Sequence, residues 1–415
     1  MATTGSDARR YERRLLVVLF LGVGFVLFDR QALAFLAPYI EFGLSSTQLG
    51  VAAGALSCTW AVSGIVMGAL SDRLGRRKSL LITAVVLFSL ISAVSGLVTG
   101  FLGLFVARAL MGAAEGGVIP LAQSLMAQAS RPKRRGLNMG LIQGASAGLL
   151  GGVVAPFAFI RLAESVGWRW SFLVTLLPGL LIAGAMAVIV RERPSAPVVG
   201  TTLKPRAPLR EVLSQRNVVL CVLIAICFLT WFATVVTFTP RYLLSVKGFT
   251  PGTMGTVMTC LGVAWMVWGV ATPAISDRIG RKPALVGFSV LAVCCPLAVM
   301  FVDDAWLLGA AMMVTYTGVG CFTLFMAVIP AETVSPGALA TAVGVTMGVG
   351  ELLGGALGPV LAGWASDRWG LDAAMVIAAV SAALVVLLGL GLRETAPRAL
   401  ARSKDPLPPL VEDVP

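Results

Sequence analysis

Five charged residues stand inside long apolar runs of this 415-residue chain: Asp29, Arg30, Arg108, Glu115 and Glu351. A charged side chain at the centre of a bilayer costs roughly 2.5–3.5 kcal/mol. Left unpaired, the five would cost roughly 15 kcal/mol, which exceeds the stability of a typical domain. We therefore expect them to pair, to take up protons or to line a wet cavity. Arg108 and Glu115 share one helix face, whereas the neighbours Asp29 and Arg30 point in different directions.

Proton chemistry in this chain falls to carboxylates or tyrosines, because the sequence contains no histidine. A carboxylate in a medium of low dielectric constant changes its proton affinity when an arginine approaches or leaves it, and a proton-coupled carrier needs that property. Asp29, Glu115 and Glu351 are therefore candidate proton-coupling groups. A static alternative is open, in which Asp29, Arg30, Arg108 and Glu115 only hold helices together.

The other reactive residue types do not indicate an enzyme. The seven cysteines lie in apolar stretches without zinc-ligand spacing, and no nucleophile and base form a recognisable set. We expect no catalytic residue, no metal site and no cofactor, with protons as the coupling ion.

The apolar runs that carry these charges predict an all-α integral membrane protein. Hydrophobic residues make up 57% of the chain and charged residues 13%, about half the charged share of a soluble protein. About 20 apolar residues cross the hydrocarbon core as a helix, and continuous runs of this length argue against a β-barrel. We predict twelve transmembrane helices, at residues 15–40, 47–70, 79–98, 101–129, 136–161, 170–190, 217–245, 252–275, 283–302, 305–333, 338–365 and 371–392.

The basic residues predict the orientation of these helices. Most of the 32 lysines and arginines lie at the two ends of the chain and in the loops at residues 71–78, 131–135, 191–216 and 278–282. The other side carries only Arg161, Arg169, Arg241, Lys247 and Arg368. Because cytoplasmic loops are rich in Lys and Arg, we expect a multi-pass protein of the bacterial inner membrane with both termini cytoplasmic. The net charge of +12 therefore reports topology, and we expect no nucleic-acid partner.

An internal repeat divides the chain into two halves. The loop Asp72-Arg73-Leu74-Gly75-Arg76-Arg77-Lys78 recurs as Asp277-Arg278-Ile279-Gly280-Arg281-Lys282, after the second span of each half. A glycine ladder also recurs, at Gly144, Gly148 and Gly152 and at Gly350, Gly354 and Gly358, and such ladders let helices approach closely. We predict two pseudo-symmetric six-helix bundles around a central cavity. Their residues are 1–190 and 217–392, with a cytoplasmic linker at 191–216 and a cytoplasmic tail at 393–415.

The chain resembles the major facilitator superfamily over essentially its whole length. The stretch from Gly68 to Lys78 and its second copy carry this resemblance. In the superfamily, such loops latch the cytoplasmic side shut in one state. The resemblance thus implies a conformational latch formed by Gly68, Asp72, Arg73, Gly75, Arg76, Asp277, Arg278, Gly280 and Arg281. A plain physical reading also exists, in which the glycines permit turns and the arginines hold the loops in the cytoplasm.

Spans one and four resemble the anion:cation symporter branch, whose members carry organic anions such as sugar acids together with protons. The resemblance rests on Phe28-Asp29-Arg30, on Arg108-Ala109-Leu110-Met111-Gly112-Ala113-Ala114-Glu115-Gly116 and on Gly167-Trp168-Arg169-Trp170-Ser171-Phe172. It implies that Asp29 and Glu115 exchange protons. It also implies that Arg30 engages the substrate carboxylate or holds Asp29, and that Arg108 pairs with Glu115. Glu351 is an additional carboxylate that many branch members lack.

Polar residues inside the spans indicate the character of the substrate. Gln143 in the fifth span and Tyr316 in the tenth are candidate substrate-binding residues, besides Arg30 and Arg108. The second half offers few amides, and a polyhydroxylated sugar acid would need polar partners in both halves. We therefore favour a small, less hydroxylated carboxylate, taken up from outside by a monomer in the lipid bilayer.

Three alternatives remain open. A proton-coupled drug or metabolite antiporter of the same fold would show a glycine-rich Gly-Pro pattern, which Gly151-Gly152-Val153-Val154-Ala155-Pro156 matches in part. An aromatic-acid symporter would carry a span-one motif that Asp29-Arg30-Gln31-Ala32 does not match. A non-transporting membrane sensor would need a cytoplasmic output element, which the linker and tail do not offer.

Overall fold

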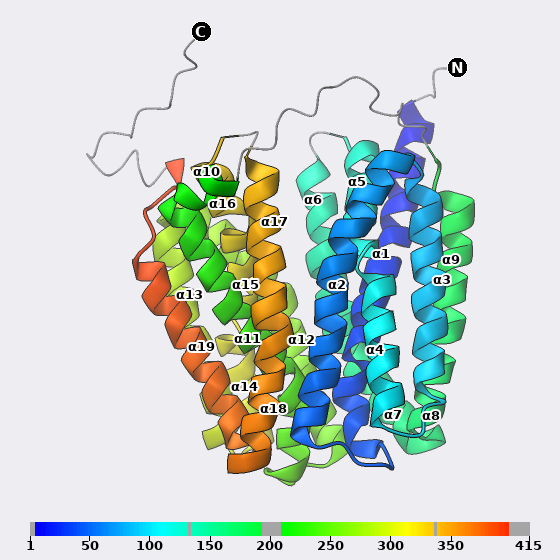
Figure 1. Ribbon diagram of the computed structural model, residues 1–415, viewed down its shortest axis with the longest axis vertical. Coiled ribbons are helices and arrows are strands. Elements are labelled where there is room, and N and C mark those ends of the chain that lie inside the picture. The colour runs from blue at the N-terminus through cyan, green and yellow to red at the C-terminus, as the bar shows by residue number, and fades with distance from the viewer. Residues whose placement is uncertain (1–4, 132–133, 193–208, 336–337, 398–415) are drawn as a thin grey trace.

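The computed structural model describes residues 5–131, 134–192, 209–335 and 338–397 (Figure 1). All regular structure in these ranges is helical, and twelve helical segments are long and apolar enough to cross a membrane. They cover residues 7–39, 46–71, 77–95, 101–129, 136–166, 168–189, 216–245, 251–279, 281–301, 305–333, 341–369 and 372–390. Each predicted span is confirmed, with ends that shift by about two helical turns or less.

The first six spans form what we call the N bundle. Its helices are α1 (Gly5–Leu36) with η1 (Ala37–Tyr39), α2 (Ser46–Leu74), α3 (Arg77–Ser95), α4 (Phe101–Glu115), α5 (Val118–Ala129), α6 (Arg135–Gly140), η3 (Leu141–Ala145), η4 (Ala147–Val154), α7 (Ala155–Val166), α8 (Trp168–Val174) and α9 (Leu176–Ile189).

The last six spans form the C bundle, preceded by the short α10 (Leu209–Ser214). Its helices are α11 (Arg216–Ser245), α12 (Pro251–Ile279), α13 (Arg281–Phe301), α14 (Ala305–Thr315), α15 (Gly318–Thr323), η5 (Leu324–Val328), α16 (Ile329–Thr333), α17 (Leu339–Val349), η6 (Gly350–Ala356), α18 (Leu357–Trp369) and α19 (Asp372–Leu390). Most of the predicted linker and tail lies outside the described residues, and the predicted domain boundaries stay a prediction.

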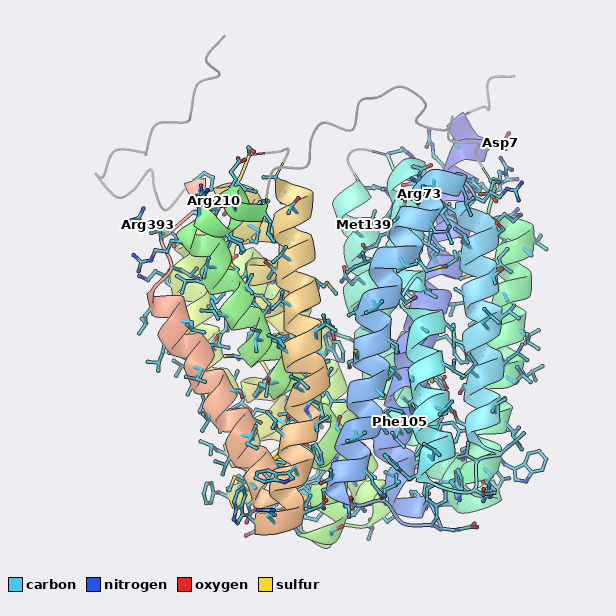
Figure 2. All side chains as sticks on the ribbon, viewed as in Figure 1. Asp7, Arg73, Phe105, Met139, Arg210 and Arg393 are labelled. Atoms are coloured by element: carbon cyan, nitrogen blue, oxygen red, sulfur yellow. The ribbon has the colours of Figure 1, made fainter. Side chains whose placement is uncertain are left out.

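The beginning of α1 and the described residues that follow α19 lie at one end of the molecule, which we call the terminal face (Figure 1). Arg73, Arg210 and Arg393 lie at this face, whereas Phe105 lies towards the other end, the opposite face (Figure 2). The terminal face is therefore the side that the sequence analysis predicts to be cytoplasmic.

The glycine ladders of spans five and eleven coincide with π-helical turns. These turns are η4 in the N bundle and η6 in the C bundle, and η3 precedes η4 in the same span. Gln143 lies in η3 and Glu351 in η6. Because π turns are rare and occur frequently at functional sites, their recurrence at matching places supports the repeat and draws attention to these two residues.

The two bundles meet towards the opposite face, where glycines bring backbones together. A Cβ atom on Gly50 or Gly54 of α2 would overlap the backbone at Pro359 or Ala356 of the C bundle. A Cβ atom on Gly152 of η4 would lie 2.5 Å from the Cα of Gly262 in α12. Two seams therefore close this side of the molecule. In the first, α2 packs against η6 and α18, and in the second, η4 packs against α12.

Towards the terminal face, the same spans diverge. Gly140 and Gly144 in the fifth span and Gly344 in the eleventh have no atom within 4 Å of an added Cβ. The side chain of Ile65 on α2 is 65% exposed. The molecule is thus closed at the opposite face and open between the bundles at the terminal face.

Replacing Gly152 by alanine tests the role of the seams. The added Cβ cannot fit against the Gly262 backbone, so we expect Gly152→Ala to separate the seam and to favour the state that is open at the opposite face. We expect a cysteine at Val360, which packs against Gly54, to react faster with a membrane-impermeant thiol reagent in this variant. The background carries serine at the exposed Cys58 and Cys294.

The matched control is Gly144→Ala, which places the same methyl group in open space on the same span. It should leave the reaction rate of the Val360→Cys reporter within about twofold of the parent. Equal rates in the two alanine variants would contradict the assignment of the seam.

Candidate functional site

Asp29 lies buried in the N bundle, on the side of α1 that faces α3 and the junction of α8 and α9. Its Oδ1 accepts a hydrogen bond of 2.7 Å from the Ser92 hydroxyl, whose oxygen lies 3.2 Å from the Thr175 hydroxyl. Its Oδ2 has no hydrogen-bond partner among the described residues. One oxygen of this carboxyl group is therefore held in place and the other is open.

Arg108 on α4 is a fully buried guanidinium close to two acidic side chains. It interacts electrostatically with Asp29 and Glu115. Neither forms an ion pair with it within 4.0 Å, among the described residues. Its Nη1 lies 3.5 Å from the Met111 sulfur, and its guanidinium lies 5.3 Å from the centre of the Phe172 ring. Nε and Nη2 have no hydrogen-bond partner in the described structure, so this cation can still accept a carboxylate on either side.

Glu115 is buried at the end of α4, and neither carboxyl oxygen has a hydrogen-bond partner within the described part of the chain. Neighbouring glycines explain why the Glu115 side chain is buried. A Cβ atom on Gly112 or Gly116 would overlap the α2 backbone, and the Ser63 hydroxyl of α2 donates to the Ala113 carbonyl at 2.5 Å. The close contact of α2 and α4 thus seals Glu115 from the surroundings.

Arg30 points away from Asp29, as the sequence predicts, and reaches across to the C bundle. Its Nη2 donates to the Ser57 hydroxyl at 3.0 Å and lies 3.9 Å from Oε2 of Glu351. The guanidinium also stacks over Trp60, 5.3 Å from the ring centre. Of the ion pairs between described residues, this one joins the two bundles. The Arg30 side chain remains 23% exposed, so a further anion can reach it.

The structure places the two other candidate substrate residues in different bundles. Gln143 accepts a hydrogen bond of 2.7 Å from the amide of Gln123 in the N bundle. Tyr316 is buried in the C bundle, with its ring centre 5.1 Å from that of Trp231. The Tyr316 hydroxyl and the Trp231 indole N–H have no partner among the described residues. Within the described ranges, Tyr316 forms no hydrogen bond or ring contact with the charged candidates of the N bundle, which are Asp29, Arg30, Arg108 and Glu115.

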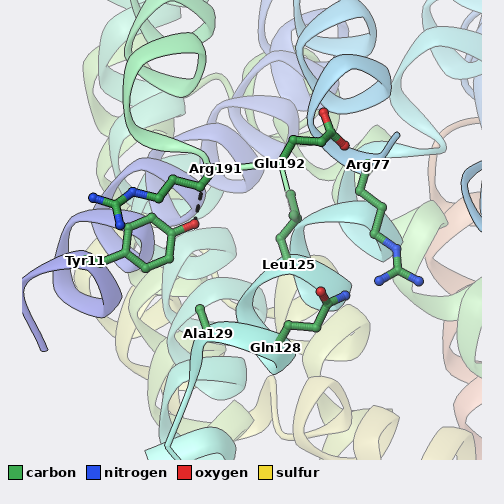
Figure 3. A pocket seen from close by; sticks show the side chains of 7 residues that line it. All are labelled: Tyr11, Arg77, Leu125, Gln128, Ala129, Arg191 and Glu192. Carbon is green, nitrogen blue, oxygen red and sulfur yellow. Dashed lines mark hydrogen bonds between the residues drawn. The ribbon is translucent and has the colours of Figure 1, made fainter. Parts of the chain in front are cut away.

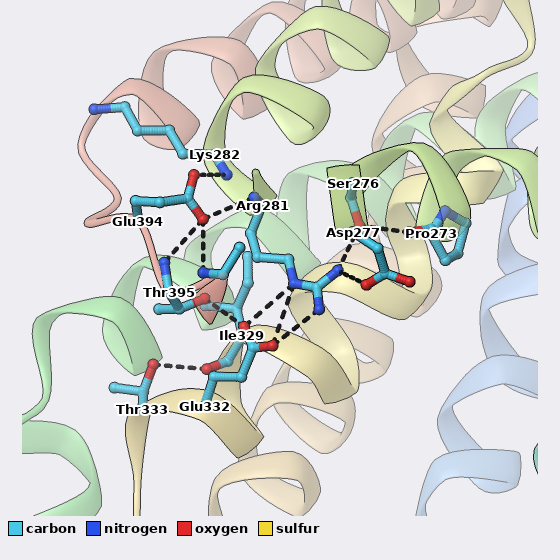
Figure 4. A network of polar contacts seen from close by, with 11 residues as sticks. Pro273, Ser276, Asp277, Arg281, Lys282, Ile329, Glu332, Thr333, Glu394 and Thr395 are labelled. Carbon is cyan, nitrogen blue, oxygen red and sulfur yellow. Dashed lines mark hydrogen bonds and ion pairs between the residues drawn. The ribbon is translucent and has the colours of Figure 1, made fainter. Parts of the chain in front are cut away.

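Arg281 organises the second copy of the predicted latch (Figure 4). It pairs with Asp277 at 2.5 Å and with Glu332 at 2.9 Å, and Nη1 also donates to Ser276. Glu394 accepts the backbone N–H groups of Arg281 and Lys282 at 2.8 and 3.1 Å. All these partners lie in the C bundle or directly after its last helix, so this copy holds its own half of the molecule together in this conformation.

The two copies of the loop turn at a glycine in the same place. Gly75 and Gly280 both have positive φ angles, 64° and 111°, which glycine adopts without strain. Arg73, Arg76 and Arg278 are exposed, and Gly68 has open space around it. The Asp72 side chain lies outside the part of the chain that the structure describes.

Two residues beyond the spans stabilise the loops in matching ways. Glu192 accepts the Lys78 N–H at 3.1 Å, as Glu394 does with Lys282. Beside it, the Arg191 N–H donates to the Tyr11 hydroxyl in a hollow of about 10 Å³ that is too small for a substrate (Figure 3). The sequence indicated this match, because Arg191-Glu192 follows the sixth span as Arg393-Glu394 follows the twelfth.

Sequence reasoning missed the hydroxyls and the ring that hold the charged groups. Ser57 and Trp60 lie three residues apart on α2, so their shared face could have indicated a common partner. Ser92 and Thr175 carried no signal, because single hydroxyls are common in membrane helices.

The sequence model of the Major Facilitator Superfamily matches residues 19–352. The chain belongs to the Major Facilitator Superfamily. The hexuronate transporter of Bacillus subtilis (strain 168) is 28% identical over 337 residues, covering 75% of this chain and 78% of that protein. The probable 4-methylmuconolactone transporter of Cupriavidus pinatubonensis (strain JMP 134 / LMG 1197) is 27% identical over 304 residues, covering 71% and 70%.

The fold of this Major Facilitator Superfamily member also matches a solved structure. A bacterial homolog of the human lysosomal transporter Spinster superposes with a TM-score of 0.77 at 20% identity, covering 94% of this chain and 98% of the other. The protein is therefore a transporter of this superfamily and not an enzyme. The relatives are consistent with the resemblance to the anion:cation symporter branch.

Removing Arg108 tests whether it neutralises the buried carboxyl groups. Since breaking a buried charge cluster from one side leaves an uncompensated charge, we expect Arg108→Gln to lower the free energy of unfolding by about 3 kcal/mol. The double variant Arg108→Gln/Glu115→Gln should recover part of this loss. Thermal unfolding in detergent measures both, with the exposed Arg14→Gln as control. Strictly additive losses in the double variant would contradict the coupling.

Proposed function

We propose that this transporter is a secondary active, proton-coupled symporter that takes up a small organic anion, a carboxylate, by alternating access. The observation that carries the proposal is that the chain has two arginines in different surroundings, one buried among carboxyl groups and one open to an anion. Arg108 is buried and interacts electrostatically with Asp29 and Glu115, and Arg30 is partly exposed between the bundles. The first can respond to protons and the second can bind an anion.

Arg30 is the proposed anion-binding group. Ser57 and Trp60 hold its guanidinium in place. Glu351 lies 3.9 Å away, beyond hydrogen-bond distance. A substrate carboxylate can form shorter, two-pronged bonds to a guanidinium, which are stronger. The substrate therefore competes with Glu351 for Arg30, and protonation of Glu351 releases the arginine.

Asp29 and Glu115 are the proposed proton carriers within the N bundle. Their oxygens without partners and the free N–H groups of Arg108 allow more than one pairing. When one carboxyl group takes up a proton, Arg108 turns towards the other, so that the charge of the cluster changes without exposing a charged group to lipid. Substrate and protons together neutralise the site, and the bundles then rock around it.

The substrate contacts of the C bundle are proposed to come from rings and hydroxyls. Tyr316 and Trp231 offer unpaired donors next to the clustered rings of Phe228 and Phe325. Gln143 supplies an amide from the N bundle. Transporters of hexuronate and of 4-methylmuconolactone are among the relatives, which supports an organic anion as the substrate. The preference for few hydroxyl groups rests on the small number of hydrogen-bonding side chains in this set.

The orientation follows from the charge pattern. We propose that the protein lies in the inner membrane of a bacterium as a monomer, with its terminal face in the cytoplasm and protons as the only coupling ion. In that orientation the conformation described above is open to the cytoplasm, ready to release substrate.

Neutralising the proton carriers tests the coupling. We expect Asp29→Asn and Glu115→Gln to abolish concentrative uptake of a labelled carboxylate into proteoliposomes driven by a proton gradient. Counterflow exchange, which needs no net proton movement, should persist. The control is Glu211→Gln, an exposed carboxylate on α10. Full concentrative uptake by both variants would refute the proposal.

Removing the competitor of the substrate tests the anion site. Glu351→Gln keeps the shape of the side chain but loses the negative charge beside Arg30, so we expect the KM for the anion to fall by about tenfold at high pH. The matched control is Asp303→Asn, which removes the charge of an exposed carboxylate that pairs with Lys247 in the same bundle. A KM that rises in Glu351→Gln would place Glu351 among the groups that bind the substrate.

A further inference from the structure

The loop motif of the two latch copies occurs a third time, at the end of the eleventh span. Ser366-Asp367-Arg368-Trp369-Gly370 matches Ser71-Asp72-Arg73-Leu74-Gly75 and Ser276-Asp277-Arg278-Ile279-Gly280. In each copy the helix ends at the glycine, whose φ is 86°, 64° and 111°, respectively. In each, the glycine N–H donates to the serine carbonyl, at 3.0, 2.9 and 3.0 Å. The three segments are therefore one structural unit used three times.

The third copy differs from the others in position, because α18 ends at the opposite face. Its aspartate crosses the seam between the bundles. Oδ1 and Oδ2 of Asp367 accept the backbone N–H groups of Ser46 and Thr47 at 2.7 and 2.8 Å. The side chains of Ser45 and Thr47 also lie close to this carboxylate. Asp367 of the C bundle thus caps the first turn of α2 in the N bundle.

This contact is favourable for two physical reasons. The first N–H groups of a helix have no partner within it, and an acceptor that binds them stabilises the helix end. The aligned peptide dipoles also place partial positive charge at that end, which attracts a carboxylate. A second contact supports the same seam, since Nη1 of Arg241 in α11 donates to the Leu44 carbonyl at 2.8 Å.

The corresponding position of the other seam makes no such contact. Glu164 stands before Gly167 at the end of α7, as Asp367 stands before Gly370. It forms no hydrogen bond or ion pair with another described residue, and Thr250 of α12 caps its own helix. Between α7 and α12 lies a hollow of about 310 Å³, lined by Phe157, Ile160, Arg161, Glu164, Gly252, Gly255 and Thr256. The two seams are thus unequal: among the described residues, a side chain of one bundle caps a helix of the other at the α2 seam and not at the α12 seam.

We propose that Asp367 is the latch of the opposite face, the counterpart there of the two loops at the terminal face. It holds α2 against α18 while the molecule is closed at the opposite face, and the carrier must break both hydrogen bonds to open on that side. The contacts of Asp277 are consistent with this assignment. In the same conformation, Asp277 pairs with Arg281 of its own bundle and does not bridge to the N bundle within the described residues.

Spin-label distances across the opposite face test the proposal. Leu102 on α4 and Phe301 on α13 are exposed residues of different bundles near this face, and cysteines there carry the labels in a background with serine at Cys58 and Cys294. We expect Asp367→Ala to raise the ratio of the long-distance to the short-distance population by about tenfold. Asp367→Asn, which keeps one acceptor oxygen, should have a smaller effect in the same direction.

A change on the donor side makes the test specific. Ser46→Pro removes one of the two N–H groups while preserving the helix, since proline is favoured at the first helical position and Ser45 has the extended backbone that precedes proline. It should shift the ratio as Asp367→Asn does, and it should add little to Asp367→Ala.

The matched control is Glu164→Ala, at the seam without a cap, which should leave the distances unchanged. The proposal is overturned if Asp367→Asn and Ser46→Pro match the parent, or if Glu164→Ala shifts the ratio as far as Asp367→Ala. Because the asparagine and proline variants disturb packing little, they decide the matter even where Asp367→Ala does not fold.

Discussion

Charge buried in a membrane helix needs a partner, and this constraint explains most of the transporter's interior. The N bundle keeps Asp29, Arg108 and Glu115 together without a tight ion pair, so each retains polar atoms that can take a new partner. Ser92 steadies one carboxyl group, and the glycines of α4 bring α2 close enough to cover the other. A site that were fully paired would be more stable but could not change its charge. The polar atoms without a hydrogen-bond partner among the described residues are therefore the feature that suits this cluster to carry protons.

The same constraint links the charges to the movement of the bundles. Arg30 and Glu351 lie in different bundles and are 3.9 Å apart, so their interaction depends on how the bundles are placed. Glycine contacts close the opposite face, where backbones meet directly and few side chains must be rearranged on opening. A carrier needs both features, a site that senses its contents and seams that can part.

The sequence predicted the twelve spans because hydrocarbon allows few structures, and the apolar runs are long and continuous. It also predicted that Asp29 and Arg30 point apart, which follows from helix geometry alone. It could not predict that Arg30 meets Glu351, since that contact depends on the relative placement of two bundles. Nor could it predict the π-helical turns around Gln143 and Glu351, because they arise from packing between spans. The implied ion pair of Arg108 with Glu115 does not form within 4.0 Å among the described residues, because the two side chains share a helix face but stand two turns apart along it.

Proton movement during transport tests the central claim most directly. Proteoliposomes with the same weakly buffered pH on both sides are given the carboxylate from outside, and the external pH is recorded. The account predicts that the medium becomes alkaline as the anion enters, and that a protonophore abolishes the signal while labelled anion still equilibrates. Entry of labelled anion with no change in external pH, or with acidification of the medium, would contradict symport with protons.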